Sequence, residues 1–199
     1  MRVIAGIYRS RILKSLKGLA LRPTSDRLRE TLFNVLTPNI AGTRFVDLFA
    51  GTGAIGIEAL SRGAAEVVFI ENHAPAATVI RRNLESLGIN TRVTVLAVDA
   101  LRGLAMLATR KMEAPSGFDC VFLDPPYAAA EDYSRVLEFL GTADLLAPGA
   151  IVVAEHSRKF DLPEEAGALR RFRVLRQGDA ALSFYRRRGT AVGENHSAE

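Results

Sequence analysis

The sequence predicts an α/β fold in which helices cover both faces of one seven-stranded, mostly parallel sheet. From residue 44 onward, apolar runs rich in β-branched residues alternate with helix-like segments, the pattern of parallel strands joined by helices. Only a short turn separates the last two apolar runs, so they predict an antiparallel C-terminal hairpin. The 199 residues, 48% of them apolar, are enough for one good core and too few for two full domains.

The first 40 residues predict a basic extension ahead of the sheet. The run "RVIAGIYRSRILKSL" alternates loosely and favours a β-hairpin with arms at 2–7 and 11–15. The run "RPTSDRLRETLFNVL" favours a helix, which Thr24 or Ser25 can cap and which Pro38 ends. The apolar residues of this helix recur at helical spacing, at Leu28, Leu32, Phe33 and Leu36.

The remaining elements alternate along the chain. Strands are expected at 44–50, 66–71, 92–98, 118–124 and 149–156, with the hairpin strands on either side of 177–180. Helices are expected at 54–62, 74–87, 100–110 and 131–140. The predicted regions are the extension at 1–40, a catalytic domain at 41–188 and a disordered tail at 189–199.

Basic charge gathers near the start of the chain. Residues 1–44 hold nine lysines and arginines and two acids, although the net charge of the whole chain is only +4. This imbalance predicts a polyanionic partner, for which we expect nucleic acid. The single cysteine, Cys120, lies in an apolar run, so we expect a buried thiol, no disulfide and a cytoplasmic protein. We expect no signal peptide and no membrane span, because no apolar stretch is long enough for either.

The first four parallel strands each end in an acid, at Asp47, Glu71, Asp99 and Asp124. Each acid alone could cap the next helix. Four in succession favour a ligand site, because ligands of such sheets bind at the carboxyl ends of the strands. Residues 51–56 also spell G-x-G-x-x-G, a pattern of loops that hold adenosine cofactors.

Asp47 distinguishes between the possible cofactors. A carboxylate that points at the glycine loop would repel the pyrophosphate of a nicotinamide cofactor, but it suits S-adenosylmethionine, which carries a sulfonium and an ammonium. We expect Asp47 to hold the ammonium end, Glu71 to accept both ribose hydroxyls and Asp99 to accept from the adenine amine. Gly56 is expected to pack against the sheet. The expected cofactor-binding residues are Asp47, Ala50, Gly51, Thr52, Gly53, Glu71, Asn72, Asp99, Ala100 and Asp124.

The fourth strand leads into "DPPY", residues 124–127. Adjacent prolines keep the backbone extended and rigid, so the neighbouring carbonyl groups hold fixed positions. The Asp124 side chain and the Pro125 carbonyl can accept the two hydrogens of an exocyclic amine, and Tyr127 can stack on the ring that bears it. The expected catalytic residues are Asp124, Pro125, Pro126 and Tyr127.

Two sets of motifs resemble known proteins. The runs "VDLFAGTGAIGIEALSRGA", "FIEN", "VDA" and "VFLDPPY", in this order, look like a class I S-adenosylmethionine-dependent methyltransferase of the amino-group type. The start of the chain, "MRVIAGIYRSRILKSL" with "LRPTSDRLRETLFNVL", resembles the RsmD family, bacterial enzymes that methylate N2 of a guanine in 16S ribosomal RNA. The resemblance covers about residues 1–155. The final turn, "QGDAALSFYRRR", lacks the aromatic residue that is common in the family's turn.

The resemblance implies a Rossmann-like fold and a substrate in 16S rRNA, within a 30S subunit or an assembly intermediate. It places part of the N-terminal extension over the cofactor and the target base, while basic residues of the hairpin hold RNA phosphates. The residues implied in these contacts are Arg9, Arg11, Lys14, Arg22, Thr24, Asp26 and Arg29. We expect a monomer without a bound metal, because His73, His156 and His196 have no metal-ligand spacing.

Three alternatives remain open from the sequence. The run D-P-P-Y alone is shared with adenine-N6 DNA methyltransferases, so the chain could methylate amines of DNA or of another RNA. A nicotinamide oxidoreductase would leave Asp47 and the D-P-P-Y run without a role. A non-catalytic RNA-binding assembly factor would not need Asp124 or the glycines of the loop.

Overall fold

The computed structural model describes residues 1–15, 25–109, 117–126 and 130–188. Several sequence predictions therefore lie outside the described residues: those for Arg22, Thr24, Tyr127 and the tail at 189–199. The division into an extension and a catalytic domain at residue 40 stays a prediction.

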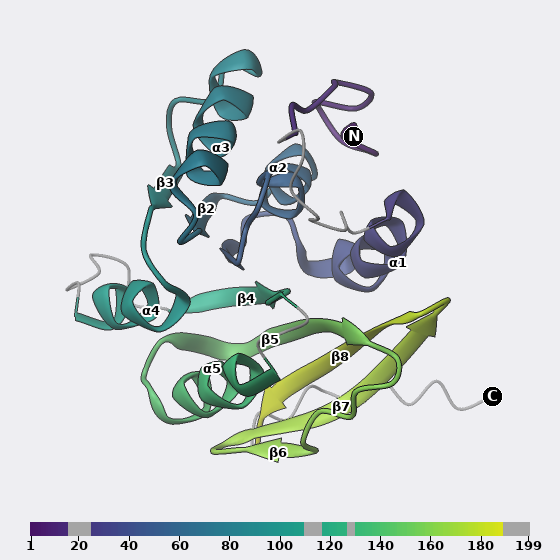
Figure 1. The fold of residues 1–199 in the computed structure, drawn as a ribbon, viewed down its shortest axis with the longest axis vertical. Coiled ribbons are helices and arrows are strands. Elements are labelled where there is room, and N and C mark those ends of the chain that lie inside the picture. Colours follow the sequence, from purple (N-terminus) through teal and green to yellow (C-terminus); the bar gives the residue numbers. More distant parts are fainter. Residues whose placement is uncertain (16–24, 110–116, 127–129, 189–199) are drawn as a thin grey trace.

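One eight-stranded sheet forms the centre of the molecule, in the order β3-β2-β1-β4-β5-β8-β7-β6 (Figure 1). Its strands are β1 (Arg44–Leu48), β2 (Glu66–Ile70), β3 (Val93–Leu96), β4 (Phe118–Leu123), β5 (Leu146–Ser157), β6 (Glu165–Ala166), β7 (Leu169–Gln177) and β8 (Ala180–Arg187). The first five strands run parallel, and β8, β7 and β6 each run antiparallel to the strand before them in this order. The predicted α/β fold is confirmed, with β6 as an additional strand. Its two residues are too few to form an alternating pattern in the sequence.

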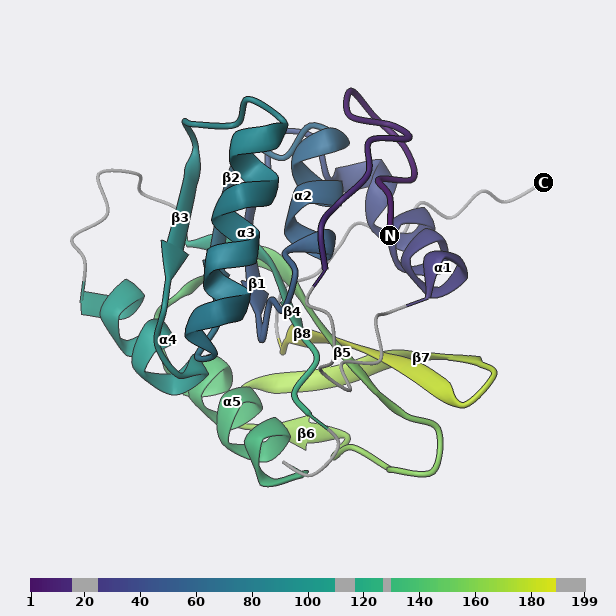
Figure 2. The ribbon, with the colours of Figure 1, turned by 45° about the horizontal axis from the view of Figure 1, so that its top comes forward.

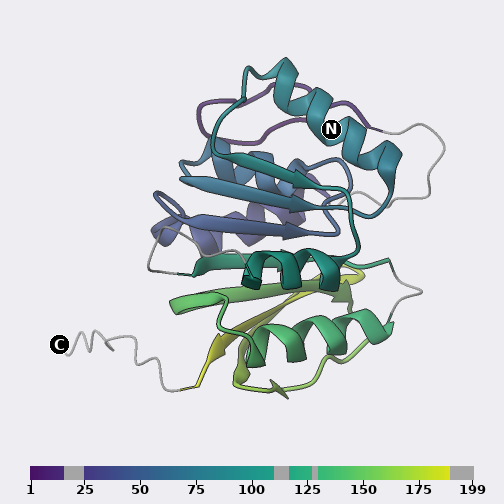
Figure 3. The same ribbon diagram turned by 90° about the vertical axis from the view of Figure 1, so that its left-hand side faces the viewer.

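Helices cover both faces of the sheet, as predicted (Figure 3). They are α1 (Asp26–Leu36), α2 (Ala54–Ser61), α3 (Ala74–Ser86), α4 (Ala100–Thr109) and α5 (Ala130–Thr142), with a short 3-10 helix, η1 (Thr37–Asn39). The first three pack on one face, together with the N-terminal residues Val3 and Leu13. The other face is covered by α4 and α5. Ser25 caps α1, because its hydroxyl oxygen accepts from the backbone N–H of Leu28.

The N-terminal segment, residues 1–15, departs from the predicted hairpin (Figure 2). A single antiparallel bridge joins Arg2 to Ile12, and regular strands are absent from the described part of this segment. Backbone hydrogen bonds pair residues 1–3 with residues 10–13, whereas N–H groups within residues 4–8 donate to α2. At Gly6 the approach is so close that a Cβ would lie 1.8 Å from the carbonyl oxygen of Ser61. Strand patterning alone does not reveal this tertiary contact.

The strand order places a crevice between β1 and β4. From β1 the chain crosses to β2 on one side, whereas β4 lies on its other side. Loops that follow such neighbouring strands diverge to opposite faces, and ligands of open α/β sheets bind at this switch point. The acids predicted at the strand ends are therefore brought to one edge. In the described residues, none of the helices is long and apolar enough to cross a membrane.

Candidate active site

The loop between β1 and α2 has the backbone that its glycines predict. Gly51 and Gly53 have φ angles of +56° and +77°, and Phe49 also has a positive φ of +59°. A Cβ at Gly51 would meet nothing nearer than the Phe49 carbonyl oxygen at 3.9 Å, so the loop is open at this point. The strained Phe49 backbone is consistent with a loop held in place for a ligand.

Gly56 lies one turn into α2 and packs against the sheet, as predicted. A Cβ at this position would lie 2.3 Å from the ring of Phe69 on β2. Its backbone N–H donates to Oδ2 of Asp47 at 2.9 Å. The third glycine of the motif therefore sets the distance between helix and sheet.

Asp47 is buried below the glycine loop, with 2% of its surface exposed. Burial raises the pKa of this carboxyl group to about 8, the bond from Gly56 opposes the shift, and the nearby charge of Glu71 adds to it. A carboxylate in this position is costly unless a positive charge approaches it. The predicted acid therefore lies under the glycine loop, and its carboxyl group is almost completely shielded from solvent.

Glu71 follows β2 and holds the glycine loop. Its Oε2 accepts from the backbone N–H of Gly51 at 2.7 Å, and its Oε1 accepts from that of His73 at 2.8 Å. Each carboxylate oxygen has a second lone pair, so hydroxyl groups of a ligand could still donate to it. Glu71 therefore positions the loop and remains a candidate ribose contact.

The acid at the end of β3 has a simpler local role. Asp99 is exposed, and its Oδ1 accepts from the backbone N–H of Arg102 at 2.9 Å, which caps α4. Asn72 is exposed and Ala100 is buried at the start of α4. The cap accounts for Asp99 without a ligand, so its predicted adenine contact stays a prediction.

Asp124 lies beside a glutamate that the sequence analysis missed. In the β4–β5 register Leu123 pairs with Ala154, which brings Asp124 next to Glu155. Burial raises the pKa of Asp124 well above its usual value, and the charges of Glu155 and Asp47 raise it further. Glu155 is 6% exposed. It is a fifth acid at the end of a parallel strand, and its place in "VVAEH" is the signal that could have revealed it.

Three carboxyl groups of this edge, those of Asp47, Glu71 and Asp124, form no ion pair within the part of the chain that the structure describes. Pro125 is buried and Pro126 is exposed, so the chain turns outward directly after Asp124. Such a site suits a ligand that brings its own positive charge.

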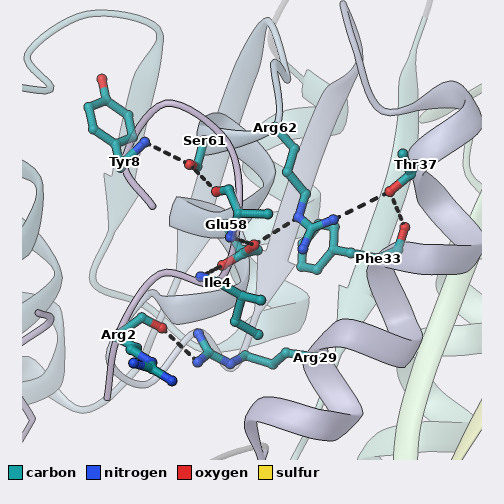
Figure 4. A network of polar contacts seen from close by, with 10 residues as sticks. Arg2, Ile4, Tyr8, Arg29, Phe33, Thr37, Glu58, Ser61 and Arg62 are labelled. Atoms are coloured by element: carbon teal, nitrogen blue, oxygen red, sulfur yellow. Dashed lines mark hydrogen bonds and ion pairs between the residues drawn. The ribbon is translucent and has the colours of Figure 1, made fainter. Parts of the chain in front are cut away.

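Glu58 on α2 fastens the N-terminal segment to the domain (Figure 4). Its two oxygens accept from the backbone N–H groups of Ile4 and Ala5 at 2.7 and 2.9 Å, and Arg62 donates to it at 2.7 Å. The side chain of Glu58 is fully buried. The segment that carries Arg9 and Arg11 is thereby held rigidly on the sheet domain.

Arg29 on α1 is buried and bonds to the N-terminal segment. Its side chain is fully buried, and its Nη2 donates to the Arg2 carbonyl at 2.8 Å (Figure 4). The same Nη2 donates to Oδ1 of Asp26 at 2.7 Å. The part implied for Arg29 in the segment over the cofactor and the target base stays a prediction, but in the structure the Arg29 side chain is buried inside the fold. The sequence could not show this, because an arginine at a helix start is usually solvated.

Arg9, Arg11 and Lys14 are exposed, as phosphate contacts require. Lys14 also connects to the glycine loop through a residue that the sequence did not indicate. The Oδ1 of Asn83 accepts from the Lys14 backbone N–H at 2.8 Å, while its Nδ2 donates to the carbonyls of Lys14 and Thr52. This fully buried asparagine joins the basic segment to the predicted cofactor loop.

The family described as Conserved hypothetical protein 95 matches residues 1–186. The chain belongs to this family. The protein named Ribosomal RNA small subunit methyltransferase D from Escherichia coli K12 is 34% identical over 197 residues, covering 98% of this chain and 93% of that protein. The protein of the same name from Haemophilus influenzae is 36% identical over 157 residues, 78% of each chain.

Solved structures of similar proteins share the fold. The structure of yhhF from Escherichia coli has a TM-score of 0.79 and 30% identity, covering 94% of this chain and 97% of that one. HI0767 from Haemophilus influenzae has a TM-score of 0.74 and 31% identity, covering 92% and 96%. These structural neighbours are class I methyltransferases, which confirms the fold class predicted for this chain.

Other side chains of the family member have structural roles. His156 is buried and bonds to Ser183 Oγ and to the Ser157 carbonyl, both at 2.9 Å. Burial lowers its pKa. Cys120 is a buried free thiol, as predicted, and burial raises its pKa. Among the described residues, no cluster of His, Cys, Asp and Glu could hold a metal ion.

Proposed function

We propose that this chain is an S-adenosylmethionine-dependent rRNA methyltransferase that modifies the exocyclic N2 amine of a guanine in 16S rRNA during small-subunit assembly. Methyl transfer to rRNA agrees with the family and with the names of its relatives. The observation that carries the proposal is the group of desolvated carboxylates beside an open glycine loop, without a cationic partner among the described residues.

The chain's residues fit such a cofactor in charge and in shape. When bound, S-adenosylmethionine supplies a methyl group that its positive sulfur activates for transfer. Asp47 and Asp124 would hold its cationic end, because burial raises the pKa of both carboxyl groups, the charges of neighbouring acids add to this, and a cation would relieve both effects. Glu71 would accept from the ribose hydroxyls while it continues to hold the loop at Gly51. The backbone of Ala50, Thr52 and Gly53 would line the cofactor site on the side of the glycine loop.

Asp124 and the Pro125 carbonyl would orient the target amine. Both accept hydrogen bonds, so they would direct the nitrogen lone pair outward, toward the methyl group. As nitrogen bonds to the methyl carbon, the carbon–sulfur bond breaks and positive charge develops on nitrogen. Asp124 would stabilise this charge, and either Asp124 or water would take the proton. A carboxylate with a raised pKa is a better base than an exposed one.

The RNA would reach the site as a base that is unpaired or turned out of its stack. Arg9, Arg11 and Lys14 would hold the backbone of the RNA, and the segment around Arg22, Thr24 and Asp26 would close over the base. The enzyme is proposed to act as a monomer in the bacterial cytoplasm, on a 30S subunit or an assembly intermediate.

Transfer of labelled methyl groups to unmodified 30S subunits and to free 16S rRNA tests this function. Asp124→Asn is expected to lower kcat by about 100-fold or more, because it removes the charge opposite the developing cation. Asp119→Asn is the matched control on the same strand. Asp119 accepts from the Arg44 backbone N–H at 2.8 Å, an interaction that asparagine can keep, and we expect near-normal activity.

Mass spectrometry of the product then identifies the modified atom. A methyl group on guanine N2 supports the proposal. Methylation of adenine N6, or of DNA in preference to rRNA, would support an amino-methyltransferase of another nucleic acid. Equal kcat values for the two variants would remove Asp124 from the mechanism.

A further inference from the structure

The β7–β8 hairpin is strongly basic. Residues 169–188 contain seven arginines and one acid, Asp179. Three of the arginines bond to acids or carbonyl groups of the fold: Arg171, Arg187 and Arg188. Four form no ion pair with any described residue: Arg170, Arg173, Arg176 and Arg186. Within the described residues, four cationic side chains of this hairpin therefore have no acidic side chain paired with them.

The strand register assigns three of these arginines to one face. Arg170 lies opposite Arg186, and Arg173 lies opposite Phe184. Phe184 belongs to the core on the face that α1, α2 and α3 cover. Because side chains alternate along a strand, Arg186 is on the same face as Phe184, and its cross-strand partner Arg170 shares that face. Arg176 lies opposite Ala181 and belongs to the other face.

Phe172 lies between these arginines at a break in the register of β7. Its side chain is 45% exposed, an unusual place for a phenyl ring. The Arg186 guanidinium lies 4.4 Å from the ring centroid, and the ring of Phe184 is 6.2 Å away. The ring is thus held in position by a cation and by the core, while part of its surface remains open to a ligand.

We propose that this surface, the hairpin platform (Arg170, Phe172, Arg173 and Arg186), binds single-stranded RNA. The platform would contact phosphates through its arginines, and Phe172 would stack on an unpaired base. An open hollow in the hairpin supports this role, and its lining residues are Arg170, Arg171, Phe172, Arg186, Arg187 and Arg188. The choice of rRNA as the source of this strand rests on the proposed function.

The platform is separate from the predicted catalytic edge. Since β8 runs antiparallel to β5, Ala180 lies beside Ser157 and Tyr185 beside Val152. Arg186 is therefore toward the amino end of β5, whereas Glu155 is near its carboxyl end. The hairpin turn also bonds to α1 through Gln177 and Thr31 at 2.9 Å. The platform and the N-terminal segment thus share one face, along which a strand of RNA could extend.

Binding and kinetic measurements on the full chain test the platform. The probes are a labelled single-stranded RNA of mixed sequence, about 20 nucleotides long, and unmodified 30S subunits. Phe172→Leu keeps an apolar side chain and removes the stacking surface, so we expect RNA binding to weaken about fivefold. Arg173→Ala is expected to weaken binding and to lower the slope of log affinity against log salt by about 0.7. Both should raise KM for 30S subunits and leave kcat and S-adenosylhomocysteine binding unchanged.

Arg176→Ala is the matched control, because it removes one exposed, unpaired arginine from the other face of the same strand. Near-normal RNA affinity in this variant, with weak binding in the platform variants, supports the proposal. Equal losses of RNA affinity in Arg176→Ala and Arg173→Ala would overturn it, because the loss would then depend only on the net charge of the protein. Weaker binding to 30S subunits with unchanged binding to the free RNA would also overturn it, in favour of a ribosomal protein.

The same experiment separates the platform from the proposed function. If the wild-type chain methylates no rRNA but the platform variants still lose RNA affinity, the platform stands and the enzymatic proposal fails. If the wild type methylates rRNA and the platform variants match it in RNA affinity and KM, only the platform fails.

Discussion

At the scale of single residues, Asp47 shows how burial alters a carboxyl group that the sequence presents as an ordinary acid. The sequence places it four residues ahead of the first loop glycine. The fold surrounds it with core and gives it one backbone donor, so its pKa rises to about 8. Near neutral pH this group therefore holds a proton that a cationic ligand would displace.

We expect S-adenosylmethionine binding to release protons at pH 6.5 and its affinity to increase as the pH rises toward 8. The ligand's positive charges favour the ionised carboxylates, so binding must lower the pKa values of Asp47 and Asp124. Calorimetry in buffers of different ionisation enthalpy measures the released protons. Asp47→Asn can still accept from Gly56 but cannot titrate, and it should release fewer. Unchanged proton release in this variant would show that Asp47 does not lose a proton when the ligand binds.

Gly56 gives a second prediction at this scale. Alanine at this position would place its Cβ 2.3 Å from the Phe69 ring, so helix and sheet must move apart. We expect Gly56→Ala to lower the free energy of unfolding by about 1–3 kcal/mol, measured by denaturant titration. Phe69→Leu removes the ring, and in the double variant the two losses should be less than additive. Strict additivity would mean that the collision is relieved elsewhere.

At the scale of elements, contacts with α2 and α3 fix the N-terminal segment, whose two arms pair only over residues 1–3 and 10–13. Glu58 receives two backbone N–H groups of the segment and the Arg62 guanidinium, while Asn83 on α3 holds the segment's other arm at Lys14. Glu58 and Asn83 are fully buried, and Arg62 is 12% exposed. The segment's conformation thus depends on helices that follow it in the chain.

Glu58→Gln should loosen this segment. The change removes the charge from two hydrogen bonds and from the buried pair with Arg62, and we expect a loss of about 2–4 kcal/mol in the free energy of unfolding. Hydrogen exchange should show faster exchange at Ile4 and Ala5 than in the wild type, with strands β1 and β4 still protected. Glu66→Gln breaks a more exposed pair with Arg44 and should cost less than about 1 kcal/mol. Equal losses of unfolding free energy in the two variants would contradict the role of Glu58 in holding the N-terminal segment.

At the scale of the whole molecule, the acids of the catalytic edge make the ligand-free fold sensitive to pH. The folded-state pKa of Asp47 is about 8, above its value of 3.8 without the fold, and that of Asp124 is raised too. At pH values between 3.8 and about 8, the folded state therefore binds more protons than the unfolded state. Its free energy of unfolding therefore falls as the pH rises from about 4 to 8.

Thermal unfolding at pH 5 and pH 8 checks this direction. Asp47 and Asp124 should make the wild-type Tm lower at pH 8 than at pH 5. Asp47→Asn should reduce this difference in Tm. Cofactor at 100 times its Kd should add about 2.7 kcal/mol of stability. If Asp47→Asn shows the same pH dependence as the wild type, the carboxyl group at position 47 is not a main cause.

Much of the architecture was predictable because it depends on local patterns. Alternating apolar runs indicated the five parallel strands and the final hairpin, and the glycines of the loop after β1 have the positive φ angles that glycine favours. Among the site residues, Asp47, Glu71 and Asp124 do lie at the carboxyl edge of the sheet. Their roles toward a ligand remain predictions.

The sequence by itself determined the order of the main elements along the chain and the strand-end acids, since each follows from residues close together in the chain. Only the tertiary structure decided which side chains are buried and which distant segments meet. It placed Arg29 inside the fold, set Glu155 beside Asp124 and joined Asn83 to Lys14. The physical reason is that burial and long-range hydrogen bonding are properties of the packed chain, and no local pattern of residues specifies them.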